Sequence, residues 1–230
     1  MRKQAARLIT AAGMVLAASA ALVTATGAAA GASTSPVTAA TKELFLAGYH
    51  FTVAKGTASL TVKGTITVPA ISCGSGDFVF TPELVAHYFV GTSLDTASAQ
   101  IGLGCVSGIV GYGDPVLDVG NKTVNVPHEV ARGENVAVTI TITKSSASVK
   151  IVYATTASDS STGGTPNDVE YPVALPSPPT YSPVRFSGCT VNGKSLASYK
   201  PGAWEAVNKS GKVIGVPSGI TGGTAFSVTE

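Results

Sequence analysis

Apolar and polar residues alternate with a period of two along most of the chain, which predicts β-strands and no amphipathic helix. The clearest stretches are SLTVKGTITV at 59–68 and NVAVTITIT at 135–143, each with one aliphatic face and one polar face. The run ELVAHYFVG at 83–91 is nearly all apolar, which is typical of a central strand covered on both faces. About a dozen short strands separated by turns predict an all-β fold, an antiparallel β-sandwich of the concanavalin-like, jelly-roll type. A closed barrel is the alternative.

Two further stretches carry polar side chains on one face of a strand. In TASAQIGLGC (96–105), alanine and aliphatic residues point one way and Gln100 points the other. In DVEYPV (168–173), Asp168 and Glu170 lie opposite the apolar residues. We expect Gln100 and Glu170 to meet across one concave sheet. The alternative is that both are ordinary polar residues of a solvent-exposed face.

The first thirty residues have the pattern of a secretory signal peptide. Arg2, Lys3 and Arg7 form a basic start, an uncharged apolar stretch covers 8–23, and small residues follow as a cleavage site. We therefore expect a signal peptide at 1–30, a flexible leader or short propeptide remnant at 31–43, and one β-sandwich domain at 44–230. This predicts a secreted, extracellular protein that does not associate with a membrane once the signal is cleaved. A single uncleaved membrane anchor is the alternative.

The charge balance narrows the classes of partner. Three of the 15 Lys and Arg residues lie in the signal segment, so the rest of the chain has 12 basic against 13 acidic residues. No basic patch with interleaved aromatic residues is present, which argues against a nucleic-acid partner.

The three cysteines, Cys73, Cys105 and Cys189, bear on the stability of an exported domain. We predict a Cys73–Cys105 disulfide because one cysteine ends a strand-like run and the other follows the Gln100 strand. Closing a loop of about 30 residues stabilises a fold by roughly 3–4 kcal/mol on the chain-entropy model. Cys189 is then unpaired, although the sequence leaves its pairing with either of the others open.

Several kinds of catalytic chemistry lack their motifs. The stretch GCVSG (104–108) is not a nucleophile elbow, and His50, His87 and His128 are far apart without metal-ligand spacing. We predict no cofactor and no metal. Asp168 and Glu170 lie about 6.6 Å apart along one strand face, which is compatible with a glycosidase acid pair. However, the chain has a single tryptophan and no aromatic platform for sugar rings.

The order of these segments resembles that of the glutamic peptidases (eqolisins), which are secreted β-sandwich enzymes, over roughly residues 46–230. SAQIGLGC (98–105) matches the family's Q-x-G segment, so the resemblance assigns the catalytic glutamine to Gln100. VEYPVALPSPP (169–179) is similar to the A-E-W-I-x-E-x-P segment, which makes Glu170 the catalytic glutamate. The other matching segments, in order, are AGYHF (47–51), VKGTITVPAISC (62–73), VAHYFVGTSL (85–94) and ARGENVAVTITI (131–142).

The chain departs from the family pattern around the cleft. Phe89 and Tyr171 stand where the family has tryptophan, Ser93 stands where it has aspartate, and Ala174 stands where it has a second glutamate. Supporting side chains of this kind orient catalytic groups, so their loss bears on activity. The alternative function is therefore a catalytically inactive binding module, lectin-like or on a cell surface, and a glycoside hydrolase is a third hypothesis.

The resemblance implies a secreted acid endopeptidase that acts as a monomer on protein or peptide substrates. Glu170 would take a proton from a water molecule that attacks the peptide carbonyl. Gln100 would hold that water and stabilise the oxyanion. The resemblance implies no metal and no covalent intermediate.

Overall fold

The computed structural model describes residues 40–74, 76–153, 156–159, 163–175 and 180–229. The predicted signal peptide and most of the predicted leader lie outside the described residues. The strands are β1 (Thr41–Leu44), β2 (Leu46–Thr52), β3 (Ser59–Thr67), β4 (Ile71–Ser72), β5 (Phe78–Val90), β6 (Ser93–Val106), β7 (Ile109–Val119), β8 (Lys122–Asn125), β9 (Asn135–Thr143), β10 (Ala147–Ile151), β11 (Thr156–Asp159), β12 (Thr165–Ala174), β13 (Thr180–Tyr181), β14 (Val184–Val191), β15 (Lys194–Ser195), β16 (Gly202–Val207), β17 (Val213–Pro217) and β18 (Phe226–Thr229), with one 3₁₀ turn, η2 (Leu196–Tyr199).

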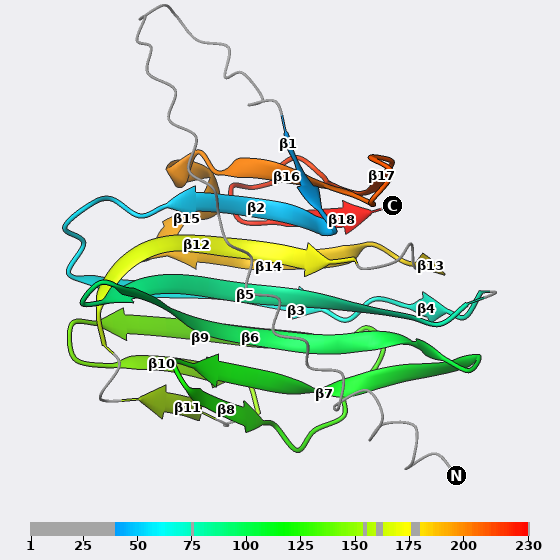
Figure 1. Cartoon of the computed structure of the whole chain (residues 1–230), viewed down its shortest axis with the longest axis horizontal. Coiled ribbons are helices and arrows are strands. Elements are labelled where there is room, and N and C mark those ends of the chain that lie inside the picture. The colour runs from blue at the N-terminus through cyan, green and yellow to red at the C-terminus, as the bar shows by residue number, and fades with distance from the viewer. Residues whose placement is uncertain (1–39, 75, 154–155, 160–162, 176–179, 230) are drawn as a thin grey trace, which may run out of the picture.

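The strands form two stacked layers, as Figure 1 shows. The front layer has the order β16-β2-β12-β5-β6-β7-β8, and the back layer has the order β11-β10-β9-β3-β14-β18. β17 pairs with β16 of one layer and β18 of the other, so the two layers are joined along that edge. The fold is the antiparallel β-sandwich predicted from the sequence, except that β1 runs parallel to β16. Within the described residues, no helix has the length and apolar character needed to cross a membrane.

The aliphatic face of each alternating strand packs between the layers. Leu60, Val62, Ile66 and Val68 are at most 1% exposed, as their alternation with threonine predicts. The inward residues of β9, which are Val136, Val138, Ile140 and Ile142, are at most 2% exposed. Complete burial of an aliphatic side chain of this size contributes about 1.5–3 kcal/mol, so these strands supply much of the driving force for folding.

Three details differ from the sequence prediction. β1 begins at Thr41, so the last residues of the segment predicted as a flexible leader are paired with β16. The Gly and Pro residues of VSGIVGYGDPVLDVG (106–120) predict a broken segment, but residues 109–119 form the continuous strand β7. A register shift in its pairing with β6, between Ile101 and Leu103, absorbs the irregularity. β5 is central, between β12 and β6, but it alternates: its inward residues are apolar and its outward residues include Glu83 and His87.

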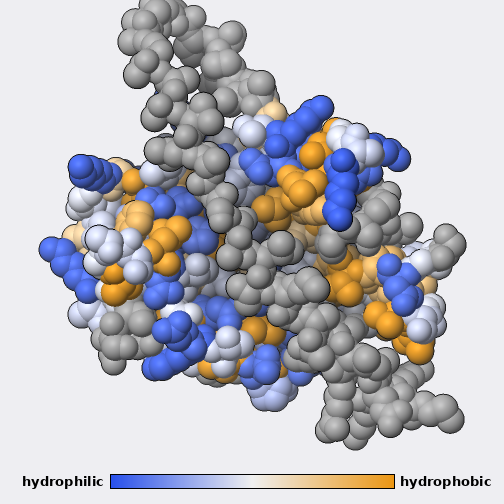
Figure 2. Space-filling model, in the orientation of Figure 1, coloured by the Kyte–Doolittle hydropathy of each residue, from blue (hydrophilic) through white to orange (hydrophobic). Residues whose placement is uncertain are grey.

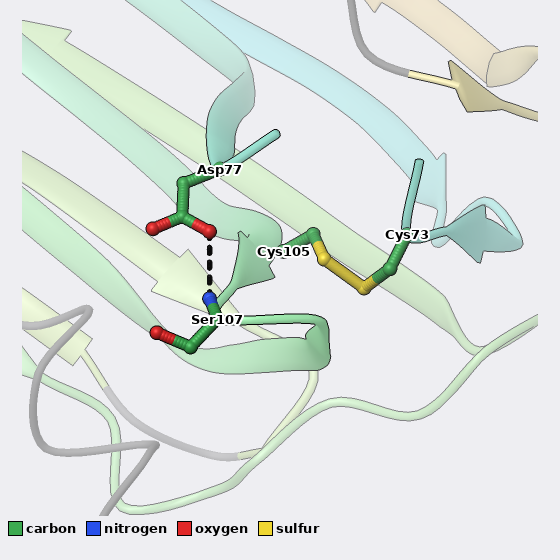
Figure 3. The surroundings of a disulfide bond; sticks show 4 residues. All are labelled: Cys73, Asp77, Cys105 and Ser107. Carbon is green, nitrogen blue, oxygen red and sulfur yellow. Dashed lines mark hydrogen bonds between the residues drawn. A yellow bond between two sulfur atoms is a disulfide. The ribbon is translucent and has the colours of Figure 1, made fainter. Parts of the chain in front are cut away.

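The predicted Cys73–Cys105 disulfide is present and links the segment after β4 to the end of β6, with the two Cα atoms 5.5 Å apart (Figure 3). Beside it, the Ser107 backbone N–H donates a hydrogen bond of 2.6 Å to the Asp77 carboxylate, which fixes the turn after β6. Cys189 is a free, buried thiol, as the pairing predicted. Burial raises the pKa of this thiol to about 12, so it stays protonated and unreactive at neutral pH.

Candidate active site

The face of the front layer that points away from the core, here called the outer face, carries both residues predicted to be catalytic. Gln100 lies on β6 and Glu170 on β12, while their neighbours Ala99, Ile101 and Val169 are buried in the core. The alternation read from the sequence is therefore correct for both strands. Figure 2 shows hydrophilic residues interspersed with hydrophobic ones on the side of the molecule seen in Figure 1, where the front layer lies nearer the viewer.

The strand register defines how these side chains are arranged on the outer face. Glu170 is paired with His50 on β2 and with Val85 on β5, and Val85 is paired with Ser98 on β6. Gln100 is paired with Glu83, two residues before Val85 on β5. Gln100 and Glu170 are thus separated by one strand and by two residues along it, which corresponds to about 12 Å between their Cα atoms. The Gln100 amide contacts Asp118 on β7, on the side of β6 away from Glu170, whereas Glu170 Oε1 lies 3.7 Å from His87 Nε2 on β5.

A hydrogen bond from β7 orients the Gln100 amide. Gln100 Nε2 donates to Asp118 Oδ2 over 3.1 Å, and Asp118 Oδ1 accepts a hydrogen bond of 2.6 Å from the Thr123 hydroxyl on β8. Because a carboxylate can only accept, the NH₂ group of Gln100 is the end that points towards Asp118. The second N–H of that group and the amide oxygen are not used by this contact.

His87 lies between the acidic residues of β12 and the Thr96 side chain of β6. Its Nε2 atom is 3.7 Å from Glu170 Oε1, and its Nδ1 atom is 3.1 Å from the Thr96 hydroxyl. Asp168, which pairs with His87 across β5 and β12, accepts a hydrogen bond of 2.8 Å from the Asn167 amide. Burial alone would lower the pKa of His87, but the carboxylates of Glu170, Asp168 and Glu83 outweigh it, and the pKa is raised.

Crowding of carboxylates changes the protonation of the acidic groups. Burial and the nearby Glu170 and Asp118 carboxylates raise the pKa of Glu83 to about 8, with a smaller opposing effect from His87. Burial and Glu170 also raise the pKa of Asp168, against the lowering effect of His87. Glu83 is therefore an uncharged carboxylic acid at neutral pH, directly opposite Gln100.

An aromatic pair lies at the β2 edge of these residues. The His50 ring stacks on Trp204 of β16 with centroids 4.3 Å apart and an interplanar angle of 15°. Burial lowers the pKa of His50 more than the carboxylates of Glu170, Asp168 and Glu43 raise it, which favours the neutral ring. The pKa values of the two histidines on the outer face are thus shifted in opposite directions. His87 has the Glu170 carboxylate 3.7 Å from its ring, whereas His50 stacks on Trp204.

Sequence reasoning found Gln100, Glu170 and Asp168 but missed Glu83, His87 and Asp118 as site residues. The available signal for Glu83 was a charged residue in an otherwise apolar strand. His87 is four residues later and therefore lies on the same face of that strand. Asp118 had no signal, because its contact with Gln100 depends on the β6–β7 register. The catalytic roles of Gln100 and Glu170 stay a prediction.

Comparison with solved structures shows which fold this is. Two structures of scytalido-glutamic peptidase with transition-state analogues align with a TM-score of 0.58 and 19% identity, covering 82% of this chain and 99% of the peptidase. SCP-B, a member of the eqolisin family in complex with the tripeptide Ala-Ile-His, aligns with a TM-score of 0.55 and 18% identity over the same shares. No protein-family model and no curated protein sequence matches the chain. The chain therefore has the β-sandwich fold of the glutamic peptidases, at low sequence identity.

Proposed function

We propose that this protein is a secreted glutamic-type endopeptidase that hydrolyses peptide bonds with Gln100 and Glu170. One observation supports it most. In a fold shared with glutamic peptidases, a glutamine and a glutamate matching the family's sequence segments lie on the same outer face, on either side of one strand. Peptide ligands are bound by those structural neighbours, which agrees with a peptide substrate for this chain.

The proposed reaction needs only a water molecule and these two side chains. The Glu170 carboxylate accepts a proton from the water, whose oxygen forms a bond to the carbonyl carbon of the peptide. The resulting oxyanion accepts a hydrogen bond from the Gln100 N–H that does not contact Asp118. Glu170 then returns the proton to the amide nitrogen as the C–N bond breaks, which releases a carboxylic acid and an amine.

Casein cleavage at acid pH tests the proposal, with Glu170→Gln and Gln100→Ala as the diagnostic variants. We expect each variant to lose most of the turnover while its thermal unfolding stays close to that of the unchanged protein. The matched control is Glu129→Gln, which makes the same change at an exposed residue away from the outer face. Acid proteolysis by both diagnostic variants at the unchanged rate would overturn the assignment.

A non-catalytic peptide- or glycan-binding module is the second candidate. Two residues of β5, Glu83 and Val85, lie between Gln100 and Glu170. This separation of the two proposed catalytic residues favours a module that binds without catalysis. A module of this kind would bind peptides or glycans on the outer face without cleaving them. Binding that Gln100→Ala abolishes, in a protein that leaves casein intact, would favour the module over the peptidase.

A further inference from the structure

The outer face has a strong excess of negative charge. The adjacent strands β2, β12, β5, β6 and β7 contain six Asp and Glu residues and no Lys or Arg. Five of the six lie on the outer face, whereas Asp95 pairs with the buried Tyr88. Among these described strands, the only basic side chains are His50 and His87. Carboxylates gathered on neighbouring strands without a Lys or Arg repel one another. A bound cation would relieve this repulsion.

Three side chains of the outer face are arranged to share such a cation. One ring nitrogen of His87, one carboxylate oxygen of Asp168 and one of Glu170 all lie within 4.8 Å of one another. The closest pair, His87 Nε2 and Glu170 Oε1, is 3.7 Å apart. Ligands at about 2.0–2.2 Å from a tetrahedral zinc ion lie about 3.4 Å from one another, so this pair needs a movement of only a few tenths of an ångström.

The other nitrogen of the His87 ring has the contact that a metal-binding histidine needs. Its Nδ1 atom lies 3.1 Å from the Thr96 hydroxyl on the neighbouring strand. An Nδ1–H that donates to this hydroxyl leaves Nε2, which lies 3.7 Å from Glu170 Oε1, as the nitrogen available to a metal ion. Thr96 lies outside the three-residue cluster, so the ring is held from the side opposite the candidate ligands.

We propose that His87, Asp168 and Glu170 bind one divalent cation of the zinc class. One imidazole and two carboxylates form a mixed nitrogen and oxygen donor set that suits zinc better than magnesium or calcium, which prefer oxygen donors alone. All three residues are only partly buried, so a cation can enter and keep water on its remaining positions.

The consequence for activity rests on the proposed function. A carboxylate oxygen of Glu170 that coordinates a cation is less able to accept the proton of the attacking water. The cation is therefore an inhibitor that competes with catalysis for Glu170. Binding of the cation itself does not depend on whether the protein is a peptidase.

Calorimetric titration of the EDTA-treated, dialysed protein with Zn²⁺ at pH 7 tests the site. We expect one equivalent to bind, and His87→Ala and Asp168→Asn each to weaken that binding at least about ten-fold. Co²⁺ used as a spectroscopic probe should give visible absorption that is lost in His87→Ala. The matched control is His128→Ala, because His128 also contacts a glutamate, with Nε2 2.8 Å from Glu134 Oε1. The described part of the chain places no second carboxylate in a metal-ligand group with His128.

The outcomes separate this proposal from the proposed function. Zn²⁺ binding that is absent at 1 mM, or equal in His87→Ala and the unchanged protein, overturns the site, whatever the casein assay shows. Zn²⁺ binding that depends on His87 and Asp168, in a protein that does not cleave casein, supports the site and rejects the peptidase. If His87→Ala does not fold, as judged by thermal unfolding in EDTA, His87→Gln takes its place in the titration.

Discussion

Asp118 on β7 holds the side-chain amide of Gln100 on β6 through a hydrogen bond of 3.1 Å, and Thr123 on β8 holds Asp118 in turn. Three neighbouring strands thus contribute to the orientation of one proposed catalytic group. A glutamine amide has donors and an acceptor that exchange places when the group rotates, so a fixed partner determines which end faces the substrate.

We therefore expect Asp118→Ala to lower kcat for peptide hydrolysis by at least about ten-fold while KM changes little, because the oxyanion donor is no longer held in place. Steady-state kinetics on a peptide substrate would measure both constants. Thr123→Ala, which removes the hydroxyl that contacts Asp118 but leaves Asp118 itself, should lose less. A KM effect with unchanged kcat in Asp118→Ala would contradict the orienting role.

The sequence predicted the fold from the alternation of its residues, whereas the catalytic roles of Gln100 and Glu170 were inferred from a family resemblance. Alternation identified the strands and their faces because a side-chain period of two is a local property of each strand. The contacts of Gln100 and Glu170 were not predictable in this way. Glu83 opposite Gln100, and His87 beside Glu170, follow from the pairing of β5 with β6 and β12, which joins segments far apart in the sequence. A shift of either register by one residue would turn these side chains to the other face.

Glu83→Gln should change how stability depends on pH. Burial and the neighbouring carboxylates raise the pKa of Glu83 in the folded protein from 4.5 to about 8. Between these values the folded state holds a proton that the unfolded state has released, so stability falls as pH rises from 4.5 to 8. A neutral glutamine removes this loss, which is at most about 5 kcal/mol at roughly 1.4 kcal/mol per pKa unit.

Urea unfolding in EDTA at the two ends of this pH range would measure the effect. The unchanged protein should lose more stability towards high pH than Glu83→Gln does. Glu129→Gln, at an exposed position, should follow the unchanged protein at both ends. Parallel pH profiles for the unchanged protein and Glu83→Gln would mean that Glu83 is charged in the folded state.

Glu134→Gln should produce the opposite trend, at a site away from the outer face. Burial would raise the pKa of Glu134, but hydrogen bonds from the Tyr153 hydroxyl, the Ala131 N–H and His128 outweigh it and lower the pKa. A lowered folded pKa gives stability that is present above the unfolded pKa and is lost as pH falls through the folded pKa. Hydrogen bonds to a charged group contribute about 1.5–3 kcal/mol when buried, so we expect a loss of about 1 kcal/mol at this partly exposed group near pH 7.

Thermal unfolding of Glu134→Gln and the unchanged protein, from neutral pH down to about pH 3, would check this linkage. The two unfolding temperatures should differ at neutral pH and converge in acid. Tyr153→Phe removes one donor and should cause a smaller change in the same direction. A difference that stays constant with pH would show that the loss is one of packing and not of the carboxylate charge.

Gly48→Ala should destabilise the fold through the contact between β2 and β12. A Cβ atom at Gly48 would lie 2.1 Å from the Tyr171 carbonyl oxygen, and its φ of +152° disfavours other residues. We expect a loss of more than about 2 kcal/mol in the free energy of unfolding, because the two backbones must separate.

Gly56→Ala is the matched control. The φ of Gly56 is +87°, but a Cβ there meets nothing within 4 Å, so this variant reports backbone strain alone. Since Glu170 pairs with His50 in the same register, Gly48→Ala should also reduce activity more than Gly56→Ala does. Equal losses of stability in the two variants, measured by urea unfolding, would mean that the close approach of β2 to β12 contributes nothing beyond glycine's backbone freedom.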